Sequence, residues 1–126
     1  MSIKAKDIRN IAIIGHSGEG KTSVCEAILF NGGSTDRLGK VTEGNTVTDY
    51  DEQEIARKMS ISLSMAYTMW DGVKLNLLDV PGFYDFEGER NEALRAAGGA
   101  LIVTSASGTL SVGTEKSIDT CLKAKI

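Results

Sequence analysis

The chain has 126 residues, of which 41% are hydrophobic, and its formal net charge is −3 at pH 7. This length suits one modest domain with its own core. The acidic balance gives no basic field for nucleic acid, and no direct nucleic-acid motif is present. No signal peptide is recognisable and no run approaches the roughly 20 apolar residues of a membrane span, so we expect a cytoplasmic protein without membrane contact.

A phosphate-binding loop is predicted near the N-terminus, directly after a buried strand at 8–14. The sequence GHSGEGKT at 15–22 fits G-x-x-x-x-G-K-[ST] at every fixed position. Glycines let backbone N–H groups turn toward phosphate oxygens, Lys21 adds a charge, and Thr22 offers a hydroxyl to Mg²⁺. An unrelated glycine-rich turn would not need a strand before it and a helix after it. We expect the phosphate contacts from His16, Ser17, Gly18, Glu19, Gly20, Lys21, Thr22 and Ser23.

A helix and then a long polar loop follow. The helix runs from about Lys21 to Asn31-Gly32-Gly33, with an apolar stripe at Val24, Ala27 and Ile28 and with Phe30 as a further member. Residues 34–58 are polar and show no sustained period. Loops of this length are usually functional or disordered, so a ligand-gated segment and a solvated insertion both remain open.

A β-hairpin is predicted next. Apolar and small residues alternate strictly over 61–69, which indicates a half-buried strand with Ile61, Leu63, Met65, Tyr67 and Met69 on one face. Asp71-Gly72 suits a two-residue turn, and residues 73–78 return antiparallel. The first strand of this hairpin should therefore lie at the edge of an otherwise parallel sheet.

Asp79-Val80-Pro81-Gly82 follows the returning strand. A carboxylate at the carboxyl end of a strand beside the phosphate loop can hold Mg²⁺ through water, and the Gly82 N–H can reach a γ-phosphate. Asp-x-x-Gly alone is more often an ordinary turn. The order of phosphate loop, polar loop, hairpin and Asp-x-x-Gly is the layout of a GTPase-type P-loop fold.

The remaining segments complete an α/β pattern. We expect a helix over 89–97 with Leu94 and Ala97 facing inward, a buried strand over 100–103, and a last helix opening at Thr114, with Ile118, Cys121 and Leu122 as its apolar positions. Cys25 and Cys121 lack metal-ligand spacing and are interpreted as buried thiols. The predicted fold is a GTPase-type P-loop NTPase mixed sheet, in the order 2-3-1-4 with strand 2 antiparallel.

Four segments together resemble the nucleotide-binding domain of the translation elongation factor G family, over nearly the whole chain. They are IIGHSGEGKTS, GNTVTDYDEQEIARKMSIS, LNLLDVPGFYDF and GALIVTSASGTLSVGTEK. The resemblance implies a partial GTP-binding domain over 1–126, with switch I at about 34–60 and switch II at about 79–90. It also implies guanine nucleotide with Mg²⁺ as ligands, and the ribosome as partner of the full-length protein.

The resemblance also assigns roles by position. Lys21 would hold the β- and γ-phosphates, and Gly82 would sense the γ-phosphate. Thr22 and Ser60 would ligate Mg²⁺ through their hydroxyls, Ser60 standing where the family has Thr. Asp79 would contact Mg²⁺ through water.

Two departures from the family pattern concern catalysis and ion binding. Phe83 stands where the family has the His that orients the attacking water, and loss of such a group costs about 10²–10⁴ in rate. A GTPase and a nucleotide-binding switch with little or no hydrolysis therefore both remain open. Gly18 stands where many relatives have an Asp that helps to bind a monovalent cation. Both changes favour a divergent elongation factor G-like paralogue.

A third departure is the missing base-recognition motif. No Asn-Lys-x-Asp occurs before Ile126, so guanine and adenine are not distinguished and a P-loop ATPase is a further alternative. We expect the chain to be a fragment of a longer protein. The strand over 100–103 would then form an exposed sheet edge, which predicts self-association.

Overall fold

A computed structural model describes residues 3–82, 87–107 and 109–126. Four strands form one sheet: β1 (Ile8–Ile14), β2 (Ser64–Trp70), β3 (Val73–Asp79) and β4 (Gly99–Ile102). The α-helices are α1 (Lys21–Asn31), α2 (Glu52–Arg57), α3 (Glu87–Ala96) and α4 (Val112–Ala124), with short 3₁₀ turns η1 (Ala5–Asp7) and η2 (Val41–Glu43). None of the helices within the described ranges is long and apolar enough to cross a membrane.

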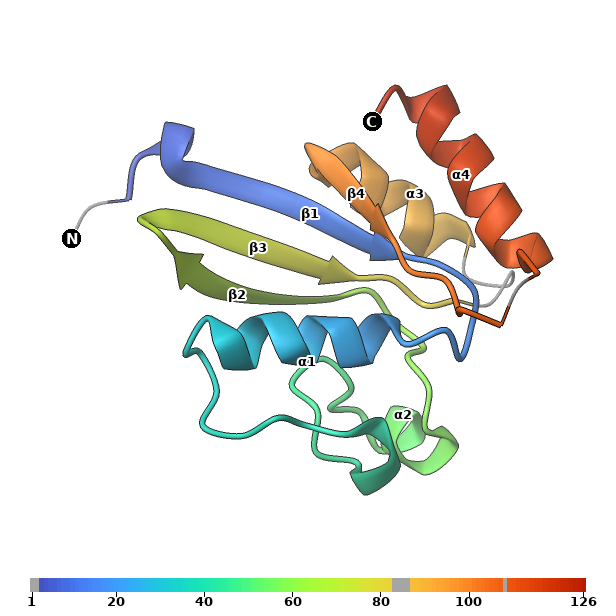
Figure 1. Ribbon diagram of the computed structural model, residues 1–126, viewed down its shortest axis with the longest axis horizontal. Coiled ribbons are helices and arrows are strands. Elements are labelled where there is room, and N and C mark those ends of the chain that lie inside the picture. The colour runs from blue at the N-terminus through green and yellow to red at the C-terminus, as the bar shows by residue number, and fades with distance from the viewer. Residues whose placement is uncertain (1–2, 83–86, 108) are drawn as a thin grey trace.

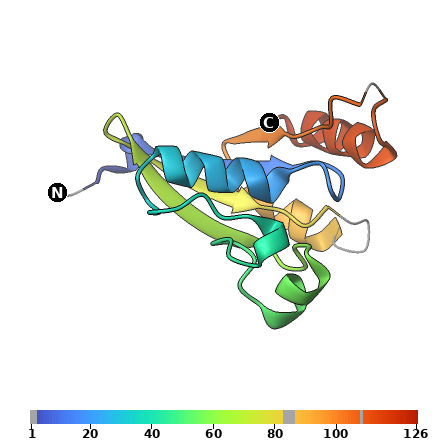
Figure 2. The same ribbon diagram turned by 60° about the horizontal axis from the view of Figure 1, so that its bottom comes forward.

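The sheet has the order β2-β3-β1-β4, which confirms the predicted topology. β1 pairs in parallel with both β3 and β4, and β2 pairs antiparallel with β3. In Figure 1, α1 and the α2 segment lie on one side of the sheet, and α3 and α4 lie on the other. In Figure 2 the molecule is turned so that α1 lies in front of the sheet. The carboxyl ends of β1 and β3 therefore meet at one edge of the sheet, beside the start of α1.

Each face of the sheet has its own apolar cluster. The cluster against α1 contains Ile13, Cys25, Leu29, Ala66 and Leu77. The cluster against α3 and α4 contains Ala12, Ile14, Leu78, Val80, Ala93, Leu94 and Cys121. Both cysteines are free and buried, as predicted. The two clusters fix β1 between the helical layers, so the phosphate loop leaves a strand that is held on both faces.

The face of β2 that lies toward α1 carries the small side chains, and the face with the large apolar side chains is turned away from it. Ala66 and Thr68 are buried, whereas Met65 is 67% exposed and Tyr67 is 56% exposed. A Cβ at Gly32 would meet the Thr68 side chain, so α1 approaches too closely for large side chains there. The predicted alternation of side chains is present in β2, but the prediction that the apolar face is the buried one is wrong.

β2 also begins at Ser64 rather than at residue 61. The N–H groups of Ile61 and Ser62 donate to the Glu54 carboxylate, at 3.0 and 3.1 Å, and the Leu63 N–H donates to Glu89 at 2.7 Å. Because carboxylates take these three donors, strand pairing starts only afterwards.

The apolar stripes expected on two helices are shifted. Cys25 and Leu29 are the buried apolar residues of α1, while Phe30 is 43% exposed. The stripe moves because polar Thr22 and Glu26 also face inward, toward the site described below.

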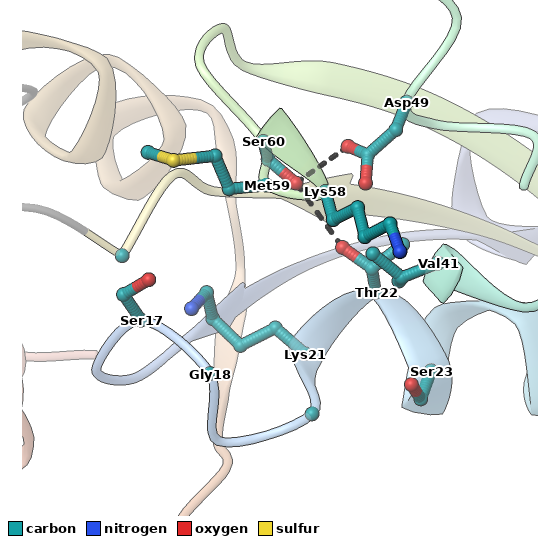
Figure 3. A pocket seen from close by; sticks show the side chains of 12 residues that line it. Ser17, Gly18, Lys21, Thr22, Ser23, Val41, Asp49, Lys58, Met59 and Ser60 are labelled. Carbon is teal, nitrogen blue, oxygen red and sulfur yellow. Dashed lines mark hydrogen bonds between the residues drawn. The ribbon is translucent and has the colours of Figure 1, made fainter. Parts of the chain in front are cut away.

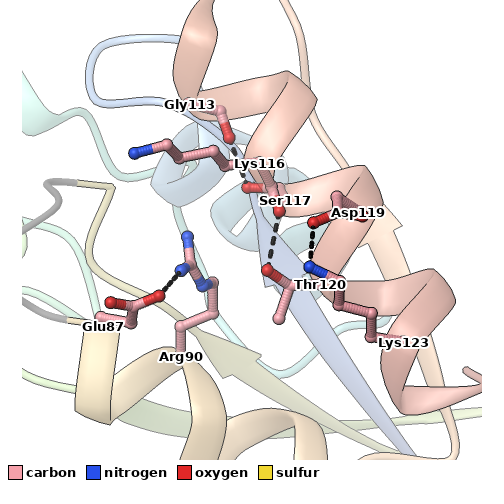
Figure 4. Close-up of polar contacts among 8 residues, drawn as sticks. All are labelled: Glu87, Arg90, Gly113, Lys116, Ser117, Asp119, Thr120 and Lys123. Atoms are coloured by element: carbon pink, nitrogen blue, oxygen red, sulfur yellow. Dashed lines mark hydrogen bonds and ion pairs between the residues drawn. The ribbon is translucent and has the colours of Figure 1, made fainter.

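α4 begins at Val112 rather than at Thr114, since Ser111 caps it by accepting from the Thr114 N–H. Of the three apolar positions predicted there, Cys121 is buried, but Leu122 is 70% exposed and Ile118 36%. Figure 4 shows that polar contacts one turn apart line this helix, including Lys123 to Asp119, and that Arg90 pairs with Glu87 on α3.

The segment predicted as a structureless loop contains η2 and α2. Asp51 and Glu54 form a reciprocal capping box at the start of α2. The side chain of each residue accepts a hydrogen bond from the backbone N–H of the other. Lys58, in the left-handed conformation, ends the helix. The segment is therefore shaped largely by its own caps and by carboxylates, which a search for apolar periodicity does not detect.

Candidate functional site

A pocket lies at the carboxyl ends of β1 and β3, between the phosphate loop and the 34–60 segment (Figure 3). Most of the predicted phosphate and metal residues line it, namely Ser17, Gly18, Gly20, Lys21, Thr22, Ser23, Ser60 and Gly82. Its other lining residues are Val41, Asp49, Lys58 and Met59. Residues predicted from three segments that are distant in sequence thus lie around one cavity.

The backbone of the loop is shaped for an anion. Gly18 and Gly20 have φ of +79° and +96°, and Gly20 precedes α1 without a side-chain cap. The first N–H groups of α1 are thereby left to a ligand at the positive end of the helix dipole. A Cβ at Gly82 would collide with the backbone N of Ser17 and with Lys21 Nζ, so this position requires glycine for close approach.

Lys21 is a buried cation that points into the loop. Its Nζ donates to the His16 carbonyl oxygen at 2.8 Å, and the residue is 6% exposed. Burial lowers the pKa of Lys21, and the carboxylates of Asp79, Glu19 and Asp49 oppose that shift. The three carboxylates thus offset part of the cost that burial imposes on the charged ammonium.

Hydroxyl and carboxylate groups form a network beside Lys21. Thr22 Oγ1 donates to Asp79 Oδ2 at 2.8 Å and lies 3.1 Å from Ser60 Oγ, which donates to Asp49 Oδ1 at 2.6 Å. Thr48 Oγ1 donates to the same Asp79 oxygen at 2.8 Å. The network joins α1, β3 and two separate parts of the 34–60 segment.

The carboxylates in this network are buried and under strong electrostatic stress. Burial raises the pKa of Asp79 to about 6, with the Asp49 charge adding to the shift and hydrogen bonds from Thr22 and Thr48 opposing it. Burial, with the charges of Glu54 and Glu26, also raises the pKa of Asp49. Asp79 Oδ1 and Asp49 Oδ2 are buried acceptors that receive no hydrogen bond from the described residues. Excess buried negative charge with vacant acceptor oxygens is an environment that attracts a cation.

This chemistry fits Mg²⁺ bound together with phosphate better than a cation held by protein alone. No group of three or more His, Cys, Asp or Glu residues within the described ranges could hold a metal ion. Mg²⁺ usually takes one or two protein oxygens and completes its shell with substrate phosphates and water. Thr22, Ser60 and Asp79 supply oxygens of that kind, beside a loop shaped for phosphate.

The other predicted site residues lie outside the cavity or outside the described structure. His16 packs against Gly113, where a Cβ would collide with its ring, and Glu19 accepts from the His16 N–H at 3.2 Å and from the Thr114 hydroxyl at 2.7 Å. Both side chains therefore tie the loop to α4. Asp79 lies beneath Thr22 without lining the cavity, and Phe83 falls in a range that the structure does not describe.

Comparison with known proteins gives a family match over nearly the whole chain. Residues 6–126 match the family described as "Elongation factor Tu GTP binding domain". The chain belongs to this family. The predicted resemblance to a GTPase-type elongation factor domain is thereby confirmed.

Relatives within the family are translation factors. An "Elongation factor G-like protein" of Mycobacterium tuberculosis is 47% identical over 100 residues, covering 79% of this chain and 14% of the relative. A "Ribosome-releasing factor 2, mitochondrial" of Drosophila willistoni is 45% identical over 103 residues, covering 82% of this chain and 14% of the relative. The chain thus spans about 14% of the length of these curated relatives.

Solved structures agree on the fold. A crystal structure of a Thermus thermophilus protein superposes with a TM-score of 0.87 at 39% identity, over 92% of this chain and 18% of that one. A bacterial selenocysteine-specific elongation factor superposes with a TM-score of 0.67 at 23% identity, over 86% of this chain and 16% of that one, and supports the fold alone. The mixed sheet with antiparallel β2 is the P-loop GTPase architecture.

Thr48 and Asp49 are the members of the hydroxyl and carboxylate network that sequence reasoning missed. Both are buried, at 1% and 4% exposure, although they lie in a polar segment. Asp49 was within the segment identified as the first switch, but nothing in the sequence separates it from Asp51 or Glu52. Its burial, its place in the pocket lining and its hydrogen bond from Ser60 single it out, and all three require the structure.

Proposed function

We propose that this chain is the GTP- and Mg²⁺-binding part of an elongation factor G-like translational GTPase, whose full-length form acts on the ribosome. Family membership supports the nucleotide class, and the printed names of the relatives support translation. The observation that carries the proposal is the pair of buried, unsatisfied carboxylate oxygens on Asp49 and Asp79, beside a loop shaped for phosphate.

The predicted residues that line the pocket, together with Asp79, have separate roles in this proposal. Lys21 and the loop N–H groups hold the β- and γ-phosphates, and the Gly82 N–H contacts the γ-phosphate. The Thr22 and Ser60 hydroxyls hold Mg²⁺, and Asp79 contacts it through water. Mg²⁺ would neutralise charge on the phosphates and on the buried carboxylates at once.

Hydrolysis is the step on which two versions of the proposal differ. A binding-only switch is the second candidate, because Phe83 cannot hydrogen-bond an attacking water as the family His does. Single-turnover hydrolysis by the full-length protein, with and without ribosomes, separates the two. Ribosome-stimulated turnover supports the GTPase. A Phe83→His substitution that gains no rate would show that Phe83 is not the block.

Nucleotide binding itself is tested by calorimetry on the full-length protein. We expect GTP to bind in the presence of Mg²⁺, and its affinity to fall strongly when Mg²⁺ is chelated. ATP at equal concentration should not compete; effective competition by ATP would favour a P-loop ATPase instead.

The remaining expectations are also part of the proposal. The chain forms part of a GTP-binding domain, with switch I at about 34–60 and switch II at about 79–90. The protein works in the cytoplasm, although several Drosophila relatives carry the word mitochondrial in their names. Association of the 126-residue chain through the β4 edge is tested by light scattering, where a stable monomer at high concentration would contradict it.

A further inference from the structure

Glu26 is a buried carboxylate that the proposed function does not use. It lies one turn after Thr22 in α1 and is 1% exposed. It takes part in no ion pair within the part of the chain that the structure describes. A buried carboxylate is costly unless hydrogen bonds satisfy its oxygens. The partners of Glu26 therefore indicate why an acid stands at this position.

Both oxygens of Glu26 accept from the backbone of the 34–60 segment. Oε2 accepts from the Gly39 N–H at 3.2 Å, and Oε1 accepts from the Val47 N–H at 2.5 Å. The two amides are eight residues apart in sequence yet share one carboxylate. Glu26 thus closes the stretch 39–47 into a loop at its neck.

The closed loop has further internal bonds and a tight neck. The Lys40 N–H donates to Asn45 Oδ1 at 2.7 Å, and Asn45 Nδ2 donates to Glu43 at 3.2 Å. A Cβ at Gly39 would collide with Glu26 Oε2 and approach the Asn45 carbonyl oxygen. The neck therefore needs both the carboxylate of residue 26 and the missing side chain of residue 39.

The exit of this loop leads directly into the candidate metal site. Thr48 follows Val47 and donates to Asp79, and the next residue, Asp49, accepts from Ser60. Because Thr48 and Asp49 directly follow Val47, holding the Val47 N–H restrains the positions from which both side chains reach the site. α1 thereby contributes twice to the site, directly through Thr22 and indirectly through Glu26.

We propose that Glu26 is a positioning residue, whose carboxylate holds the Gly39 and Val47 amides and so places Thr48 and Asp49 at the Mg²⁺ side of the phosphate site. This inference rests on the proposed function. Beyond that function, the order of the 34–60 segment and the Mg²⁺ concentration that nucleotide binding needs both depend on the Glu26 carboxylate in α1.

The test uses the full-length protein with Glu26→Gln, which keeps size but leaves only one acceptor oxygen. Hydrogen exchange without nucleotide should accelerate at least about tenfold at Gly39 or Val47. The Mg²⁺ concentration for half-maximal GDP binding should rise about tenfold, within the range known for outer-shell partners of metal ligands. GDP affinity at saturating Mg²⁺ should stay within about twofold.

Two further variants complete the design. Gly39→Ala disturbs the same neck from the loop side without removing charge, and should shift exchange and Mg²⁺ requirement in the same direction. Glu52→Gln, an exposed acid of the same segment, should change neither.

Three results would overturn the proposal. Unchanged exchange in Glu26→Gln and Gly39→Ala would show that the neck does not hold the segment. Faster exchange with an unchanged Mg²⁺ requirement would leave Glu26 a purely structural role. A wild-type protein that binds no nucleotide at any Mg²⁺ concentration would refute the proposed function, and the metal role of Glu26 with it, even where the exchange data showed an intact neck.

Discussion

The phosphate loop and the 34–60 segment, with residues 61–63 that follow it, lie on opposite sides of one pocket but are held by different means. The loop takes its shape from glycine conformations and from its position between β1 and α1. The segment takes its shape from buried carboxylates, with Glu26 binding amides 39 and 47 and Glu54 binding amides 61 and 62. A local motif therefore encodes one wall of the site, and contacts distant in sequence encode much of the other.

Removing the loop's cation should have the largest effect. Lys21→Ala in the full-length protein should weaken GTP binding at least about 100-fold, about 3 kcal/mol, because charged hydrogen bonds to two phosphates are lost. Calorimetry measures this change, with exposed Lys123→Ala as the matched control. Near-normal Mg²⁺-dependent binding by Lys21→Ala would refute the site assignment.

Neutralising Asp79, the carboxylate to which both Thr22 and Thr48 donate, should stabilise the metal-free chain. The pKa of Asp79, raised from 3.8 to about 6, means that folding loses stability as pH rises through about 6. Asp79→Asn should therefore raise the free energy of unfolding at pH 7.5 by about 2 kcal/mol, below the roughly 3 kcal/mol that the shift allows.

Urea unfolding of the 126-residue chain in chelator measures the difference between Asp79→Asn and the wild type. The difference should shrink toward zero near pH 4, where Asp79 becomes protonated in the unfolded as well as the folded state. A variant less stable than the wild type at pH 7.5 would show that the charge of Asp79 is not a burden to the fold.

Weakening the segment's second carboxylate should cost stability rather than add it. Glu54→Gln leaves one oxygen for the Ile61, Ser62 and Asp51 amides that the Glu54 carboxylate now accepts from. We expect a loss of about 1–2 kcal/mol in urea unfolding, as for a buried donor left unsatisfied. Equal stability of Glu54→Gln and wild type would mean that carboxylates do not hold this wall.

The smallest expected effect concerns Ser60, whose hydroxyl is the proposed Mg²⁺ ligand in the 34–60 segment. Ser60→Ala should raise the Mg²⁺ concentration for half-maximal GTP binding about tenfold, since one oxygen ligand is lost. Ser60→Thr keeps the hydroxyl and should behave as wild type. If both variants match the wild type in a Mg²⁺ titration, Ser60 does not ligate the metal.

The difference between the two walls also explains what the sequence could predict. The antiparallel β2 and the residues of the phosphate loop follow from local patterns, the strand order follows from the order of motifs along the chain, and the structure agrees on the fold. Asp49 and Glu26 could not be singled out, because a buried acid looks like any solvated acid until its partners are known. The exposed face of β2 was missed for a related reason, since alternation does not tell which face a helix will approach.

The central claim is that one pocket binds the phosphates and Mg²⁺ of a nucleotide between these two walls. A crystal structure of the full-length protein with Mg²⁺ and a non-hydrolysable GTP analogue tests it most directly. We predict the γ-phosphate at Lys21 Nζ and the Gly82 N–H, with the Thr22 and Ser60 hydroxyls on Mg²⁺. A nucleotide bound elsewhere, or a Mg²⁺ ion without either hydroxyl, would contradict the account.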